Sequence, residues 1–143
     1  PSVRRRSDVG RNRTFGLSGP ARGGSAFNAG MYTPQGRVRT YARLHELAGL
    51  RLRAGWSVIV DAAFLERAER DAFRALAQNA GAAFGILAPQ ATPAQLRERI
   101  EARNARGQDA SEATLEVLAQ QMQTLEPLHA AEMELVIGDP SRR

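Results

Sequence analysis

Apolar and polar residues follow one another along the chain in blocks that predict alternating helices and strands. The first predicted helix begins at Thr33-Pro34, which offers a capping hydroxyl and a proline in the first turn, and it ends at Gly55. Apolar residues at three- and four-residue spacing give this helix one apolar face. That face consists of Val38, Tyr41, Leu44, Ala48 and Leu52.

Three more helices are predicted in the second half of the chain. One is closed by Gly81 and carries the stripe Leu65, Ala68, Ala72, Leu76 and Ala80. The next begins with a capping box at Thr92–Gln95, turns Leu96 and Ile100 inward and breaks at Arg106–Asp109. The last follows a capping serine, Ser111, and its stripe is Leu115, Leu118, Met122 and Leu125.

Short apolar runs between these helices predict strands. They lie at Val3–Arg6, Trp56–Val60, Ala83–Ala88 and Leu135–Ile137. Continuous apolar runs rich in β-branched residues are typical of strands buried in a parallel sheet. Strands that alternate with helices indicate an α/β fold with a mainly parallel sheet, and we expect residues 1–143 to form a single domain.

Composition narrows the classes of function. The net charge is +5. The chain has 20 arginines and no lysine. This balance suits anionic partners, but nucleic acid is the least favoured of them because no recognised binding motif occurs and the arginines are interspersed with acids. The lack of cysteine excludes disulfides and thiolate metal sites and makes the cytoplasm the default compartment. Two distant histidines form no metal-ligand cluster, and no apolar run has the length of a membrane span.

Five segments in order resemble one family. They are Arg4–Leu17, Gly30–Leu44, Ala54–Phe73, Arg97–Gln121 and Leu125–Leu128. Together they resemble P-loop kinase-like, AAA family ATPase-like proteins, the group of zeta-toxin-like and gluconate-kinase-like domains. The most similar pattern is the ATP-binding half of proteins that fuse an aminoglycoside-phosphotransferase-like domain to a kinase-like one. The resemblance implies a three-layer P-loop NTPase-like fold, a parallel sheet flanked by helices. It also implies ATP and Mg²⁺ as cofactors and a small molecule as phosphoryl acceptor.

One part of that family pattern is missing. The family begins with a strand and a G-x-x-x-x-G-K-[ST] loop, whose backbone N–H groups and lysine bind phosphates. The nearest candidate, Gly16–Gly23, has the wrong spacing, contains Pro20 and lacks the lysine. We therefore expect a domain that is incomplete at its N-terminus or degenerate, which binds ATP poorly. The strands Trp56–Val60 and Ala83–Ala88 are expected to flank the place of the missing strand. Either they keep unpaired edges, which a missing N-terminal segment or another chain could fill, or the sheet closes over the gap.

The resemblance assigns catalytic roles to two carboxylates. Asp8, with Ser7 beside it on the substrate side, would act as base or orienter for the acceptor hydroxyl. Asp61, at the end of the most apolar strand, would orient magnesium or the acceptor, although Ala63 stands where the family more often has threonine. The alternative interpretation makes Asp8 a cap of the following turn and Asp61 a helix-entry cap.

The resemblance also assigns arginines to phosphate. Arg103 and Arg106 would belong to a lid that closes on the transferring phosphate, and Arg11 would face the acceptor or phosphate. The alternative for the lid is a solvated helix face paired with nearby glutamates. The run Arg4–Arg6 is expected to be solvated.

Three hypotheses follow from the sequence. The first is an ATP-dependent small-molecule kinase-like domain, inactive or weak without its phosphate loop. The second is a non-catalytic remnant or partner-binding module, and the third, least favoured, is a basic nucleic-acid-binding protein. The fold does not identify the acceptor.

Overall fold

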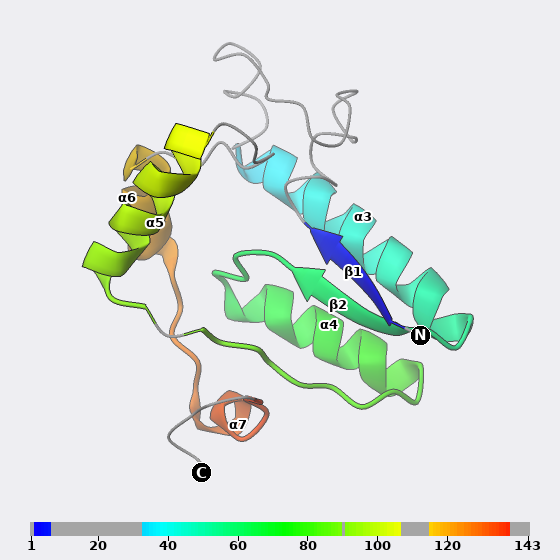
Figure 1. The fold of residues 1–143 in the computed structure, drawn as a ribbon. Coiled ribbons are helices and arrows are strands. Elements are labelled where there is room, and N and C mark those ends of the chain that lie inside the picture. Colours follow the sequence, from blue (N-terminus) through cyan, green and yellow to red (C-terminus); the bar gives the residue numbers. More distant parts are fainter. Residues whose placement is uncertain (1, 7–32, 90, 107–114, 138–143) are drawn as a thin grey trace. The chain divides into compact units, whose positions relative to one another are not determined.

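A computed structural model describes residues 2–6, 33–89, 91–106 and 115–137 (Figure 1). The chain divides into two compact units, the first ending at Phe64 and the second beginning at Leu65. The described elements are helices and a small parallel sheet, consistent with the α/β class.

Unit 1 contains two parallel strands joined through a helix. Strand β1 (Ser2–Arg6) pairs with β2 (Ser57–Asp61) in the register Ser2 to Ser57 through Arg6 to Asp61. Parallel neighbours require a crossover connection, and α3 (Pro34–Arg53) lies in that connection and runs antiparallel to β2 (Figure 1). The two strands predicted in this part of the chain are confirmed to within one residue at each end.

Local chemistry fixes both ends of α3 as the sequence predicts. The Thr33 hydroxyl oxygen accepts a hydrogen bond of 3.1 Å from the Gly36 N–H, and Pro34 opens the helix. At the other end, Gly55 has φ +80°, and the Trp56 N–H donates to the Arg51 carbonyl at 3.0 Å. This is a Schellman-type ending, which needs a residue at positive φ, and glycine adopts that conformation without strain.

The buried face of α3 differs from the predicted one. Its buried residues are Gly36, Thr40, Leu44, Ala48 and Gly49, and Leu44 is the most completely buried large side chain among the described residues. Leu44 and Ala48 are therefore confirmed, but Val38 is 68% exposed and its placement was wrong. Thr40 is buried in its place because its hydroxyl donates to the Gly36 carbonyl at 2.8 Å, which removes the cost of burying it. A hydropathy pattern does not count threonine and glycine as apolar, so it does not predict that Gly36, Thr40 and Gly49 are buried.

The first helix of unit 2 is α4 (Arg67–Asn79), which is capped by Ala80 and followed by Gly81 at φ +65°. The helix is where the sequence predicts it, but the predicted apolar stripe is wrong. Ala68, Ala72 and Ala80 are exposed, and the buried residues of α4 are instead Arg70, Phe73 and Ala77. The buried face of α4 differs from the predicted one because it includes Arg70, whose positive charge is neutralised by a buried partner.

That partner is Glu132, in the short helix α7 (Ala130–Met133), which the sequence did not predict. Arg70 Nε donates to Glu132 Oε1 at 2.6 Å and Nη2 donates to Oε2 at 3.1 Å, and the two side chains are only 6% and 3% exposed. The hydrogen bond from Arg70 lowers the pKa of Glu132 to about 2, and the same bond raises the pKa of Arg70. His129 completes the local structure, since its Nδ1 accepts from the Glu132 N–H at 3.1 Å.

The predicted strands Ala83–Ala88 and Leu135–Ile137 are reduced to one parallel bridge, between Ile86 and Val136. The Ile86 N–H donates to the Leu135 carbonyl at 2.8 Å and the Ile137 N–H donates to the Ile86 carbonyl at 2.9 Å.

Two further helices are found in the described part of unit 2. Helix α5 (Pro93–Arg106) opens with the predicted capping box: Thr92 N–H donates to Gln95 Oε1 at 2.9 Å and Gln95 N–H donates to Thr92 Oγ1 at 3.2 Å. Ile100 is buried, as predicted. Helix α6 spans Leu115–Thr124, and its predicted cap, Ser111, lies outside the described residues. Of the helices that the structure describes, none combines the length and apolar character that crossing a membrane requires.

Candidate functional site

The candidate site lies at the carboxyl edge of the sheet in unit 1. Strands β1 and β2 are parallel, and Arg6 pairs in register with Asp61, so both strands end at the same edge. Ligands of parallel α/β sheets gather outside the carboxyl ends of the strands. Asp61 is therefore positioned where the sequence predicts a functional carboxylate.

Asp61 is held by an ion pair that the sequence did not reveal. Arg4, on β1, donates from Nη2 to the Asp61 carboxylate. Both residues fall on the same side of the sheet because side chains alternate along a strand, and Arg4 is diagonal to Asp61 in the register. The side chains are 62% and 44% exposed, so the pair contributes little to stability. Its main effect is to place a positive charge against this carboxylate.

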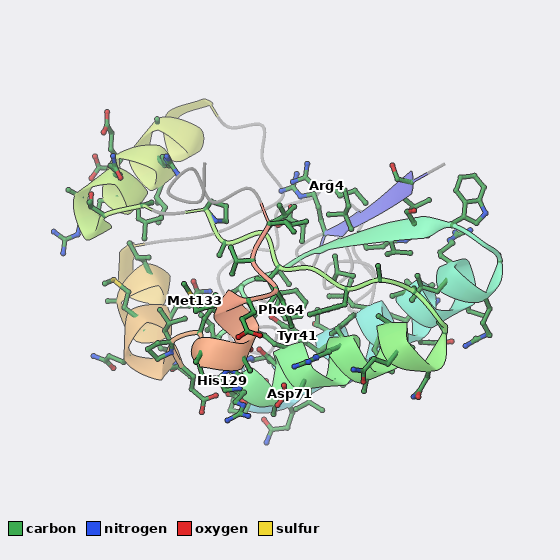
Figure 2. All side chains as sticks on the ribbon, turned by 90° about the horizontal axis from the view of Figure 1, so that it is seen from below. Arg4, Tyr41, Phe64, Asp71, His129 and Met133 are labelled. Carbon is green, nitrogen blue, oxygen red and sulfur yellow. The ribbon has the colours of Figure 1, made fainter. Side chains whose placement is uncertain are left out.

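The segment after Asp61 is fixed by an aromatic contact with α3. The Phe64 N–H donates to the Tyr41 hydroxyl oxygen at 2.9 Å, and the two rings meet edge to face with centroids 5.5 Å apart (Figure 2). Phe64 has φ +47°, a left-handed conformation that is strained for a residue with a Cβ atom. The contact with Tyr41 stabilises this turn, and strain held by surrounding contacts is common at functional sites.

One further cation lies beside this turn. The Arg37 guanidinium carbon is 5.9 Å from the centre of the Tyr41 ring, within the range of a cation–π interaction. Because Tyr41 contacts Phe64, the first two turns of α3 lie at the same edge of the sheet as Asp61. The sequence analysis assigned neither Arg37 nor Tyr41 to the site. The one sequence feature that indicates their contact is their spacing of four residues, which places them on the same face of a helix.

The other predicted site residues are not brought to Asp61 in the described part of the chain. Ser7, Asp8 and Arg11 lie outside the described residues. Arg103 and Arg106 fall in the last turns of α5, which belongs to unit 2. Their assignment to a phosphate-binding lid stays a prediction.

The described residues do not by themselves fit a Mg²⁺–nucleotide complex. Mg²⁺ takes oxygen ligands in near-octahedral geometry, usually from one or two carboxylates together with substrate phosphates. Asp61 is already paired with Arg4, and no group of three His, Cys, Asp or Glu residues that could hold a metal occurs among the described residues. The 143-residue sequence also contains no lysine that could bind phosphates as a P-loop lysine does.

Comparison with known proteins supplies the family. The sequence model of the AAA domain family matches residues 2–128. The chain belongs to the AAA domain family. This family is P-loop NTPase-like and nucleotide-binding, and its members generally bind ATP and Mg²⁺. No curated protein and no solved structure matches this AAA domain.

Proposed function

We propose that this AAA domain is the acceptor-side part of an ATP-dependent phosphotransferase acting on a small molecule. The observation that carries the proposal is Asp61, a carboxylate at the carboxyl end of a parallel strand with its side chain oriented by Arg4. A fixed carboxylate at that edge suits the orientation of an acceptor hydroxyl. Asp8 and Ser7 would complete the acceptor side, and Arg103 and Arg106 would bind the phosphate that is transferred.

The proposal includes weak nucleotide binding by the chain as it stands. Catalysis of phosphoryl transfer depends on donors and cations that surround the phosphates, and these residues include no P-loop and no lysine. The subtype within the family, zeta-toxin-like or gluconate-kinase-like, belongs to the same proposal and rests on the ordered segments of the sequence.

Titration with ATP tests this proposal. The 143-residue chain is expected to show weak or no binding of ATP by isothermal titration calorimetry, with or without Mg²⁺, and little turnover with any acceptor. Sub-micromolar, Mg²⁺-dependent binding of ATP to this chain would contradict the importance of the missing loop. An Asp61→Asn variant, which keeps the shape of the side chain, shows whether any residual turnover needs the carboxylate.

A second candidate function, a module that binds a partner strand, is favoured by the exposed strand β2. Its central residues Val58, Ile59 and Val60 are apolar on both faces, as in a strand from the middle of a parallel sheet. In the described part of the chain β2 pairs only with β1, and Ile59 is 45% exposed. An apolar edge of this kind is a template for pairing with another strand.

This candidate predicts association through β2. Analytical ultracentrifugation of the chain is expected to show concentration-dependent association, which Ile59→Lys reduces because a charge on an edge strand opposes pairing. The control is Val38→Lys, which places the same charge at an exposed apolar position of α3. The function would be contradicted if the chain stays monomeric, or if the Ile59→Lys and Val38→Lys variants associate to the same extent.

A further inference from the structure

The two outer edges of the sheet in unit 1 differ in charge. Among the described residues this sheet consists of β1 and β2, so each strand has one edge that no other described strand covers. Strand β1 carries the arginine run Arg4–Arg6, whereas β2 is apolar at Val58–Val60 and has one charged residue, Asp61, at its end. Charged residues on an edge strand oppose pairing with another chain, and apolar residues favour it. Of these two edges, that of β2 is therefore the one suited to a further strand.

The sequence of β2 matches itself when two copies run antiparallel. If the pair is centred on Ile59, the middle residue of β2, Ile59 lies opposite Ile59 and Val58 lies opposite Val60. Each Ser57 then lies opposite an Asp61 at the two ends of the pair. A shift of the pairing by two residues would instead place Asp61 or Ser57 opposite Ile59. The apolar pattern of β2 therefore selects one antiparallel register with a second β2.

This register joins apolar side chains on both faces of the sheet. Val58 and Val60 lie on the same face as Val3, the register partner of Val58 in β1, and Ile59 lies on the other face. The three valines are half-buried in the structure, and Ile59 is 45% exposed. In the antiparallel pair the valines of the two copies adjoin on one face, and the two Ile59 side chains meet on the other. Pairing therefore removes apolar surface from water on both faces.

The same register is compatible with the charges of unit 1. Each Asp61 faces a serine, whose hydroxyl can donate to the carboxylate, and the two Asp61 residues are about 13 Å apart because four residues separate them along the paired strands. The arginines of β1 lie on the outer strands of the joined sheet, one strand away from the contact. The corresponding pairing of β1, centred on Arg4, would place two arginines opposite each other. Charge therefore favours β2, and not β1, as the contact between two copies.

We propose that β2 pairs antiparallel with β2 of a second copy of this chain, with Ile59 on the two-fold axis. This inference rests on the second candidate function, association through β2, and names the partner and the register. The contact uses the same surface on both copies, so it closes at two chains. The product is one continuous sheet with two strands from each copy, whose outer edges are the arginine-bearing edges of β1.

Single-cysteine variants test the register, because the chain contains no cysteine of its own. Under a mild oxidant, Ile59→Cys is expected to form a disulfide-linked dimer, since opposite residues of an antiparallel pair have Cα atoms about 4.5–5.5 Å apart, within the reach of a disulfide. Ser57→Cys alone is expected to stay unlinked, because its two copies are about 13 Å apart. An equimolar mixture of Ser57→Cys and Asp61→Cys should give a mixed dimer, which is identified by its mass after non-reducing electrophoresis.

The matched control is Val38→Cys, at an exposed apolar position of α3, where disulfide formation measures chance collision between chains. Ile59→Cys is expected to become linked roughly tenfold faster than this control, or more, because pairing holds the two thiols together. If Ile59→Cys fails to fold, as judged by circular dichroism, the mixture of Ser57→Cys and Asp61→Cys decides the question instead. Linking of Ser57→Cys with itself, or linking of folded Ile59→Cys at the rate of Val38→Cys, would overturn the inference.

These results are distinct from a failure of the second candidate function. Association that Ile59→Lys reduces, combined with a different pattern of disulfides, would support a partner strand at β2 and overturn the symmetric pairing proposed for it. A chain that stays monomeric in the ultracentrifuge and gives no Ile59→Cys dimer would contradict both.

Discussion

Replacing Glu132 by glutamine is expected to destabilise unit 2 by about 3–5 kcal/mol, the usual cost of removing one partner from a buried ion pair. The side chain keeps its size and one acceptor oxygen, so the change is mainly the loss of negative charge opposite Arg70. Arg70 stays charged because a guanidinium does not lose its proton in proteins, and its side chain is only 6% exposed. Its other acceptors, the carbonyls of Leu65 and Pro127, lie at 3.5 Å and offer little compensation.

Amide hydrogen exchange in α4, followed in increasing urea, is the appropriate measurement. The single tryptophan, Trp56, belongs to unit 1, so its fluorescence does not report directly on this ion pair. The control is Glu134→Gln, two residues along the chain, where the side chain is exposed and a change within about 0.5 kcal/mol is expected. A loss of protection in Glu132→Gln no larger than in Glu134→Gln would show that the pair is not buried in solution.

The ends of the elements could be predicted from the sequence because each is set by chemistry within a few residues. Thr33 with Pro34, Thr92 with Gln95, and the glycines at 55 and 81 fix the limits of α3, α4 and α5 through local hydrogen bonds and φ angles. Helix α7 was missed because its cap is His129, which accepts through Nδ1, whereas the recognisable capping boxes begin with serine or threonine.

The buried faces of the helices could not be predicted in the same way, because they depend on partners distant in the sequence. Arg70 is buried only because Glu132, 62 residues later, neutralises it. Thr40 is buried because its hydroxyl is satisfied by a carbonyl one turn earlier. In both cases the polar group is paired, and a pattern based on residue type alone places it in solvent.

Only part of the candidate site could be predicted, because some of its contacts also join residues that are distant in the sequence. The place of Asp61 follows from the apolar run before it, since the residue after a parallel strand lies at the carboxyl edge. Its partner Arg4 was expected to be solvated with the rest of its basic run, and the pairing depends on the register between β1 and β2, which the sequence does not contain. The contact of Tyr41 with Phe64 likewise joins residues 23 positions apart.

Acid is expected to destabilise the folded chain specifically through Glu132. Its pKa is about 2 in the folded state, below the ordinary glutamate value of 4.5, because Arg70 donates hydrogen bonds to the carboxylate. A lowered pKa means that the unfolded chain binds the proton more readily than the folded one. The stabilisation is therefore complete above about pH 5 and is lost as the pH falls toward 2. The difference corresponds to about 3 kcal/mol, and the side chain is buried enough that solvent screening removes little of it.

A variant with both charges removed isolates this effect from that of the other carboxylates. Arg70→Met combined with Glu132→Leu replaces the ion pair by apolar side chains of similar volume, which in other buried pairs is neutral or stabilising at neutral pH. Urea unfolding followed through α4 exchange at pH 7 and at pH 2.5 should show the wild-type chain losing about 3 kcal/mol more than this double variant. Equal losses in the two proteins would mean that Glu132 does not titrate differently on folding, and the buried ion pair could then not be the group that makes unit 2 sensitive to acid.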